Sequence, residues 1–400
     1  MNSVSRLTLR AAVAAIALGS LASSSRADGV GTVFVIAMEN HNFTQPSTFT
    51  AIQQLQGNTA APYLNSLITP GNPNAAMTSY ATNYTNAGQG VHPSEPNYIW
   101  AEAATNYNAA TNTVITNDAD PSVAAKNIFD PNQTQHLTAL MNQQGVSWTN
   151  YQEDYQVSGN GPLKSSSGNY AGGAVNPYYG SPQYNYAVKH NPMAFFTDTA
   201  TQNVAPLGQL ATDLANNTVA KYNWISPNQY NDMHSSLNTN FTYNGVTYTH
   251  NTDQQAIAIG DNFLSQIVPQ IEASQAFKNN GAIVIWNDET EGGDGPGFTS
   301  TEIVISPLAV GNAFASNVAL NHSSDIKTMQ EIFNVGPFIN NSIPLTEPGA
   351  DGSYNTVSGS NDLSSLFQAG TIPAATPEPG SLSVIALGAL GLLSRRRRKA

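Results

Sequence analysis

The sequence of 400 residues has no cysteine and few charged side chains. Without cysteine, the chain forms no disulfide, holds no metal through thiolates and has no cysteine nucleophile. Charged residues make up 10% of the chain, against roughly 25% in an ordinary soluble domain. The 14 Lys and Arg face 26 Asp and Glu, which gives a net charge of -12. Because affinity for nucleic acids comes mostly from basic side chains, we expect no nucleic acid partner.

What the sequence does have is enough apolar material for a large core. Hydrophobic residues make up 40% of the chain, and its 31 Gly and 23 Pro follow no collagen-like repeat. The composition therefore predicts a folded body, not a charge-driven disordered chain.

The N-terminal residues have the composition of an export signal. Arg6 and Arg10 precede an apolar run over residues 11–21, and small residues follow at the positions that a signal peptidase reads, Ser25 and Ala27. We predict a secretory signal peptide over residues 1–27. The alternative is an amphipathic N-terminal helix, which the lack of a polar stripe in the run disfavours.

The C-terminal residues form a second signal. A Pro-Glu-Pro string at 377–379 precedes a mostly apolar segment over 382–393 and a basic cluster over 395–399. The apolar segment is shorter than the roughly 20 residues that cross a bilayer. This order resembles the PEP-CTERM sorting signal of Gram-negative bacteria that make extracellular polysaccharide.

That resemblance implies a route out of the cell. The tail is held for a time at the inner membrane, basic side inward, and is then removed by a sorting protease. The body is delivered to the cell surface or to an exopolysaccharide matrix. The alternative is that the tail stays as a permanent short anchor.

Between the two signals, the sequence predicts one domain and a linker. Residues 28–344 show no internal repeat and are predicted to form a single catalytic domain. Residues 345–375 are rich in Gly, Ser, Pro and Thr and show little periodicity apart from residues 363–367, which predicts a flexible spacer before the sorting segment at 376–400.

Two runs of apolar and β-branched residues, 30–38 and 282–286, are typical of central strands that are buried on both faces. Further strands are predicted over 222–226 and 303–306. Helices are predicted over 51–68, 96–105, 134–144, 254–274 and 323–333. This alternation predicts an α/β fold with a mostly parallel central sheet flanked by helices on both faces.

Acidic residues follow both central strands. Glu39 and Asn40 come directly after the first, and Asp288 and Glu289 follow the second. Since ligands of open α/β sheets bind at the carboxyl ends of the strands, these oxygen-bearing side chains predict one cation site.

Short distinctive strings are spread across the body, at residues 38–43, 92–98, 145–154, 189–192, 225–234, 285–289 and 321–324. In this order they resemble the phosphoesterase family of secreted acid phosphatases and bacterial phospholipases C, within the alkaline phosphatase superfamily. Asn42 stands where the family usually has Ser. The resemblance implies an alkaline-phosphatase-like three-layer sandwich.

The resemblance also implies a mechanism. Ser94, two residues before Pro96-Asn97, matches the nucleophile, which attacks phosphorus beside a divalent metal and forms a phosphoseryl intermediate. The implied metal ligands are Glu39, Asn40, Ser94, Asp288 and Glu289. These are oxygen donors, which favour Ca²⁺, Mg²⁺ or Mn²⁺ and leave Zn²⁺ as an option.

A second group of residues matches the superfamily's other metal site or its phosphate contacts. Its members are Asp232, His234, His322, Asn228 and His92. The close Asp-Met-His spacing and Glu289 both depart from the two-zinc pattern, so we expect one firm metal site. His190, His234 and His322 are then expected to contact phosphate or to protonate the leaving group. His136 and His250 lie outside every string and are given no role.

The sequence thus predicts a secreted, metal-dependent phosphoester hydrolase, with phosphomonoesters favoured. A phospholipase C-type phosphodiesterase is one alternative, although the body shows no membrane-facing segment. A non-catalytic matrix or surface binding protein on the same fold is the other. Without its signals the body has 6 basic and 25 acidic residues. Because such a surface repels a phosphate ester, the bound cation is also expected to help capture it.

Overall fold

The structure is a computed structural model that describes residues 29–87, 91–119, 121, 128–155, 157–158, 161–162, 175–340 and 357–372. The predicted signal peptide and sorting segment lie outside these residues. In the part of the chain that is described, no helix is both long enough and apolar enough to cross a membrane.

An eight-stranded sheet runs through the molecule in the order β14-β2-β13-β12-β1-β9-β5-β8. The strands from β12 to β8 pair in parallel, whereas β13 runs antiparallel to both its neighbours. The predicted mostly parallel sheet is therefore confirmed. Its strands are β1 (Thr32–Met38), β2 (Thr78–Ala81), β5 (Trp148–Gln152), β8 (Val204–Pro206), β9 (Tyr222–Ser226), β12 (Gly281–Asn287), β13 (Glu302–Ile305) and β14 (Phe314–Ser316).

Within the described residues, three two-stranded ribbons lie outside this sheet. They pair β3 (Tyr107–Asn108) with β4 (Thr113–Val114), β6 (Val157–Ser158) with β7 (Gly161–Pro162), and β10 (Phe241–Tyr243) with β11 (Val246–Tyr248).

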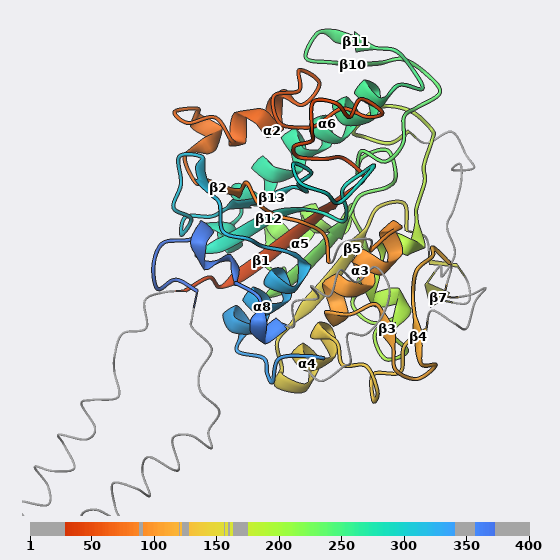
Figure 1. Ribbon diagram of the computed structural model, residues 1–400, viewed down its shortest axis with the longest axis vertical. Helices are drawn as coiled ribbons and strands as arrows, with labels where there is room; N and C mark the ends of the chain where they lie inside the picture. Colours follow the sequence, from red (N-terminus) through yellow and green to blue (C-terminus); the bar gives the residue numbers. More distant parts are fainter. Residues whose placement is uncertain are drawn as a thin grey trace, which may run out of the picture.

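Helices cover both faces of the sheet (Figure 1). The α-helices are α2 (Pro62–Leu67), α3 (Ser94–Ala103), α4 (Leu137–Gln144), α5 (Gln209–Asn216), α6 (Asp253–Glu272), α7 (Gln275–Lys278) and α8 (His322–Phe333). Short 3-10 helices are η1 (Pro73–Ala75), η3 (Val188–His190), η4 (Pro192–Phe195), η5 (Val357–Gly359) and η6 (Leu363–Leu366).

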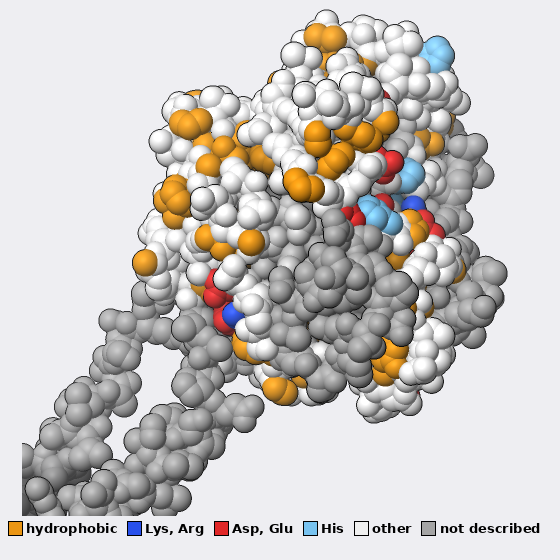
Figure 2. Space-filling view, viewed as in Figure 1, with side chains coloured by type: hydrophobic (Ala, Val, Ile, Leu, Met, Phe, Trp, Pro, Cys, Tyr) orange, Lys and Arg blue, Asp and Glu red, His pale blue; other side chains and the backbone are white. Residues whose placement is uncertain are grey.

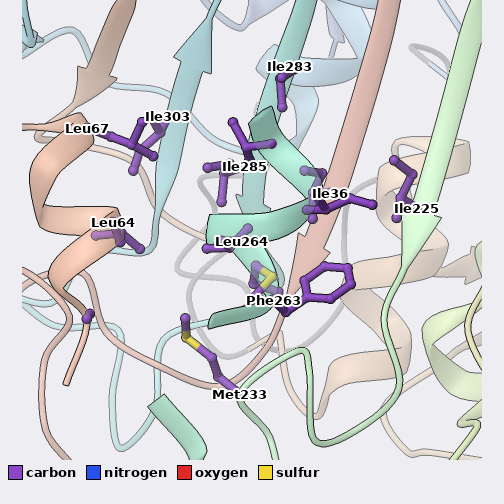
Figure 3. Packing of buried hydrophobic residues seen from close by; sticks show 14 of the residues in the cluster. Ile36, Leu64, Leu67, Ile225, Met233, Phe263, Leu264, Ile283, Ile285 and Ile303 are labelled. Carbon is purple, nitrogen blue, oxygen red and sulfur yellow. The ribbon is translucent and has the colours of Figure 1, made fainter. Parts of the chain in front are cut away.

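The alternation of side chains along β1 explains the layers. Phe34 and Ile36 point into a core shared with α2, α5 and α6, while Val33 and Val35 point into a core shared with α3, α4 and α8. Figure 3 shows the first core, where Ile36 and isoleucines of the neighbouring strands meet leucines of the covering helices. Two apolar faces on one sheet require two helical layers, and the predicted three-layer sandwich is confirmed.

The predicted helix over residues 51–68 is wrong for most of its length. Only Pro62–Leu67 is helical, and Pro62 at its start is suited to the first turn. The residues before it form loops that side-chain amides hold in place. Gly57 donates its N–H to Asn65 Oδ1, and Ala60 donates to Asn58 Oδ1. Such local side-chain bonds compete with helix formation.

Part of the expected spacer packs on the body. Leu363 and Leu366 are buried in the core under α8. Leu363 donates its N–H to Thr328 Oγ1, and Leu366 accepts from the N–H of Val310. Residues 357–372 therefore differ from the flexible chain that their composition predicts, because a few spaced apolar residues are enough to anchor a polar segment.

Candidate active site

The carboxyl ends of β1 and β12 lie at the same edge of the sheet. The register pairs Met38 with Asn287, so the residues that follow them, Glu39 and Asp288, are neighbours. Asn40 donates its N–H to Asp288 Oδ1 at 3.3 Å. Asn40 also takes a left-handed backbone conformation, which Asn tolerates better than most residues. The predicted meeting of the two acidic strand ends is confirmed.

Ser94 brings its hydroxyl to this edge. It is the first residue of α3 and is buried. Its Oγ donates to Glu39 Oε2 at 3.0 Å and lies 3.4 Å from Asn40 Oδ1. The first N–H groups of a helix have no acceptor within the helix and so favour an anion, which places the hydroxyl between a carboxylate oxygen and a helix end of this kind.

His190 links Glu39 to Asp232. Its Nε2 lies 2.9 Å from Glu39 Oε1, and its Nδ1 lies 3.1 Å from Asp232 Oδ2. The ring stacks on Tyr98 with 4.9 Å between centroids. Burial lowers the pKa of His190, but the two carboxylates outweigh it and raise the pKa to about 9. His190 is therefore an imidazolium that holds Glu39 in place, with both nitrogens engaged.

Of the acidic groups in the site, the carboxyl of Asp288 has the least favourable surroundings for a negative charge. Its carboxyl is fully buried, and Oδ2 has no hydrogen-bond partner. Burial and the neighbouring Glu39 and Glu289 raise the pKa of Asp288 well above its usual range. In contrast, although burial alone raises the pKa of Glu39, His190 lowers it to about 2.

Glu289 is engaged with His92. Its Oε2 lies 2.7 Å from His92 Nδ1 and accepts from Asn97 Nδ2 at 3.1 Å. The other nitrogen of His92 lies 3.0 Å from Asp294 Oδ1. His92 thus faces two carboxylates at the rim of the site. The roles predicted for Glu289 as a metal ligand and for His92 as a phosphate contact stay predictions.

His234 lies beside His190, with 6.0 Å between the ring centroids. Its backbone N–H donates to Asp232 Oδ1 at 2.8 Å, and its Nδ1 lies 3.0 Å from Ser235 Oγ. Burial lowers the pKa of His234 to about 4, so its ring is neutral at pH 7. None of these contacts engages Nε2, and the proton-transfer role predicted for His234 stays a prediction.

His322 does not reach the site. The predicted phosphate or metal contact of His322 is wrong, because both ring nitrogens are engaged inside the core. Nε2 donates to the backbone carbonyl of Asp288 at 2.5 Å, and Nδ1 accepts from Trp286 Nε1 at 3.1 Å. Burial lowers the pKa of His322 to about 3. The residue supports Asp288 from behind.

The contact predicted for Asn228 is also wrong. Its Nδ2 donates to Asp154 Oδ2, and its Oδ1 accepts the backbone N–H of Tyr230 and Asn231. The side chain closes a turn after β9 and has no group left for phosphate. With His322 in the core, the second metal set of Asp232, His234 and His322 is not brought together.

The residues at this edge fit a hard cation by their chemistry. Within the described ranges, no three His, Cys, Asp or Glu side chains are grouped so that they could hold a metal by themselves. The donor set here is instead two carboxylates, an amide oxygen and a hydroxyl, from Glu39, Asp288, Asn40 and Ser94. A cation bound to the buried, unpartnered Asp288 Oδ2 would favour the ionised form of this carboxyl, whose pKa is otherwise raised.

The sequence prediction missed Lys189 and Asp118. Lys189 Nζ lies 2.9 Å from Asp118 Oδ2. On the face shown in Figure 2, acidic, histidine and basic side chains gather at one place. The available signal was the position of Lys189 directly before His190, in a body with only 6 basic residues.

These features define an α/β protein that carries a serine, carboxylate and histidine site at the carboxyl edge of its sheet. A model of the Phosphoesterase family matches residues 75–336, and the chain belongs to that family. Residues 375–399 match the PEP-CTERM protein-sorting motif, which confirms the predicted sorting signal.

Several known proteins are similar to this chain. A probable acid phosphatase of Kluyveromyces lactis is 28% identical over 152 residues, a match that covers 36% of this chain and only 30% of that relative. A protein of the alkaline phosphatase superfamily from Vibrio parahaemolyticus is 12% identical, over 77% of this chain and 67% of its own, with a TM-score of 0.40. The phosphonate monoester hydrolase of Agrobacterium radiobacter is 10% identical, over 87% and 78%, with a TM-score of 0.43.

Proposed function

We propose that this protein is an exported, metal-dependent phosphoester hydrolase that works through Ser94 and prefers phosphate monoesters. The observation that carries the proposal is the hydroxyl of Ser94 at the start of α3, 3.0 Å from Glu39 Oε2. Family membership and the similarity to a probable acid phosphatase support it.

The site residues divide the reaction among them. Ser94 releases its hydroxyl proton to solvent as its Oγ attacks phosphorus, the bond to the ester oxygen breaks, and the leaving oxygen takes a proton from the His234 imidazolium. Although His234 is neutral in the free protein, a bound phosphate dianion favours its protonated form. A water then attacks the phosphoserine, which releases phosphate and restores the hydroxyl. His190 keeps Glu39 oriented throughout.

A divalent cation bound by Glu39, Asn40, Asp288 and Ser94 would favour the serine alkoxide and offset charge on the phosphoryl oxygens. The oxygen donors favour Ca²⁺, Mg²⁺ or Mn²⁺. Together with the sorting motif, this describes an enzyme that acts outside the inner membrane, at the surface or in a matrix, after a sorting protease has removed its tail.

The proposal is tested by turnover of p-nitrophenyl phosphate and p-nitrophenylphosphorylcholine, each with Ca²⁺, Mg²⁺ or Mn²⁺. We expect release of nitrophenol from the monoester. Ser94→Ala should lower the rate by at least about a thousandfold, while the exposed Ser47→Ala keeps it. Full activity in Ser94→Ala, or no turnover with any metal, contradicts the proposal. Preference for the phosphorylcholine ester would make the protein a phosphodiesterase.

A further inference from the structure

Basic side chains are scarce in the body of this protein. Between residues 28 and 375 the sequence has no Arg and six Lys. Of the four Lys that the structure describes, Lys221 directly precedes β9 and Lys278 ends α7, both at the amino edge of the parallel strands. Lys327 lies on α8 and bonds Ser360. Lys189, next to His190, is thus the described lysine that lies near Ser94.

A carboxylate connects Lys189 to the start of the nucleophile helix. Asp118 Oδ2 lies 2.9 Å from Lys189 Nζ, and Asp118 Oδ1 accepts the backbone N–H of Glu95 at 3.1 Å. Glu95 directly follows Ser94. One anionic group therefore spans the ammonium of Lys189 and the first amide after the nucleophile.

This arrangement has the chemistry of a phosphoryl site. Both a carboxylate and a phosphoryl group present anionic oxygens to such donors, and a helix N-terminus with a nearby Lys is a favourable place for either. Asp118 comes from the surface, with 34% of its side chain exposed, so it can leave without opening the core. Asp288 Oδ2, buried at the same edge without a hydrogen-bond partner, leaves this edge with unfilled capacity for a cation, and a bound cation would add to the attraction for a phosphoryl group.

The charge of Lys189 is maintained by its surroundings. Burial lowers the pKa of the ammonium, but Glu39 and Asp118 outweigh burial and raise it. A phosphate ester that approaches this strongly acidic body thus finds a permanent positive charge beside the serine.

We propose that Lys189 and the backbone amide of Glu95 bind oxygens of the substrate's phosphoryl group, and that the ester displaces the carboxylate of Asp118, which occupies this place in the free protein. The inference rests on the proposed function, since Lys189 and the Glu95 amide would bind the substrate of that reaction and Asp118 would compete with it. It makes Asp118 an internal competitor of phosphate esters and of inorganic phosphate.

The test measures binding of inorganic phosphate by calorimetry, and KM for p-nitrophenyl phosphate, in the wild-type protein and three variants. Lys189→Met should weaken phosphate binding and raise KM by about 10- to 100-fold, as expected for loss of a charged hydrogen bond. Asp118→Asn should strengthen phosphate binding and lower KM, each by about two- to fivefold, since it removes a weak exposed competitor. Lys221→Met, at the far edge of the sheet, should leave both unchanged.

The opposite signs separate this role from that of a structural salt bridge. If Lys189 and Asp118 only stabilised the fold, both variants would weaken binding together, and that result overturns the proposal. Unchanged phosphate binding in Lys189→Met also overturns it. A wild-type protein that binds phosphate but does not turn over the ester would contradict the proposed function. Phosphate binding in the Lys189 and Asp118 variants would then still test the roles of these two residues.

Discussion

The Nε2 atom of His322 lies 2.5 Å from the backbone carbonyl oxygen of Asp288. This contact joins the first residue of α8 to the residue that follows β12. The indole of Trp286 donates to the other nitrogen and so fixes which nitrogen of the ring carries the proton. From these contacts we expect His322 to act by positioning the backbone of a metal-ligand candidate.

Replacing His322 should impair catalysis through Asp288. His322→Gln leaves the carbonyl and the indole with poorer partners, and loss of such supporting contacts typically costs about 10- to 100-fold in activity or metal affinity. We expect kcat to fall while KM for p-nitrophenyl phosphate changes little. His250→Gln, at an exposed histidine that bonds only Asn240 among the contacts described, is the matched control. Equal kcat in both variants would contradict this role.

His234 and His190 should differ in their response to the leaving group. If His234 supplies the proton, His234→Asn should slow hydrolysis of phenyl phosphate by about 100-fold or more, and that of p-nitrophenyl phosphate much less, because nitrophenolate leaves without a proton. His190→Asn should slow both substrates by the same factor, because the role proposed for His190 is to orient Glu39, whose Oε1 lies 2.9 Å from its Nε2. Steady-state rates for the two esters check this, and a uniform loss in His234→Asn would assign the proton to another group.

Metal removal should affect stability as well as activity. Glu39 and Asp288 are buried together, so a cation between them offsets their repulsion. At a concentration of about 100 times its Kd, a metal that binds only the folded state adds about 2.7 kcal/mol to the free energy of unfolding. Thermal denaturation of chelator-treated protein with added Ca²⁺, Mg²⁺ or Mn²⁺ measures this gain.

Two variants test whether the metal that stabilises the protein binds at this site. Asp288→Asn should lose the thermal shift, whereas Glu272→Gln at the end of α6 should keep it. Absence of any shift in the wild-type protein, with activity unchanged after chelation, would contradict a metal at Glu39 and Asp288.

The strands and the meeting of their acidic ends could be predicted from the sequence. Runs such as 30–38 and 282–286 are nearly continuous in apolar and β-branched residues because both faces of the sheet are covered, and short runs of this kind are typical of central strands. Once both were assigned to parallel central strands, Glu39 and Asp288 had to share an edge. This part of the site follows from topology alone.

The inward or outward direction of the polar residues could not be predicted. His322 and His234 occur in equally distinctive strings, but α8 packs the first ring against Trp286, while a turn leaves the second near the surface. The side-chain amide of Asn228 similarly bonds the backbone of its own turn, where its Oδ1 accepts the N–H of Tyr230. These outcomes depend on contacts between segments far apart in the chain, which no local pattern reports.

Gly260 should be required where α6 passes the turn that carries Asp232 and His234. A Cβ at this position would lie 2.2 Å from Met233 Cγ and 3.2 Å from the backbone oxygen of Asn231. Met233 itself has a φ of 84°, and its side chain is fully buried. Overpacking costs about 1–3 kcal/mol, which exceeds the gain of up to about 1 kcal/mol from replacing glycine in a helix.

Gly260→Ala is therefore expected to lower both the free energy of unfolding and the activity, as measured by denaturant titration and p-nitrophenyl phosphate turnover. The control is Gly208→Ala, where a Cβ meets no atom within 4 Å. A Gly260→Ala protein as stable and active as the control would show that the turn can shift without cost.

His136, which carries no predicted function, should make stability depend on pH. Its two nitrogens lie 2.7 Å from Glu102 Oε1 and 2.9 Å from Asp198 Oδ1, and its ring is fully buried against Phe196. Burial lowers the pKa of His136, but the two carboxylates outweigh it and raise the pKa from 6.5 to about 9. The folded protein thus holds this proton more tightly than the unfolded chain does.

The sign of the effect follows from that difference. The stabilisation, on the order of 3 kcal/mol, is complete below pH 6.5, falls as the pH rises and is lost above about pH 9. In thermal denaturation from pH 6 to 10, the wild-type protein should therefore have a higher midpoint temperature than His136→Gln. This difference should shrink steadily as the pH rises. His250→Gln should follow the wild-type curve. A margin that is constant across this range would mean that His136 contributes packing and hydrogen bonds but no charge, since only an ionised ring can lose its contribution by deprotonation.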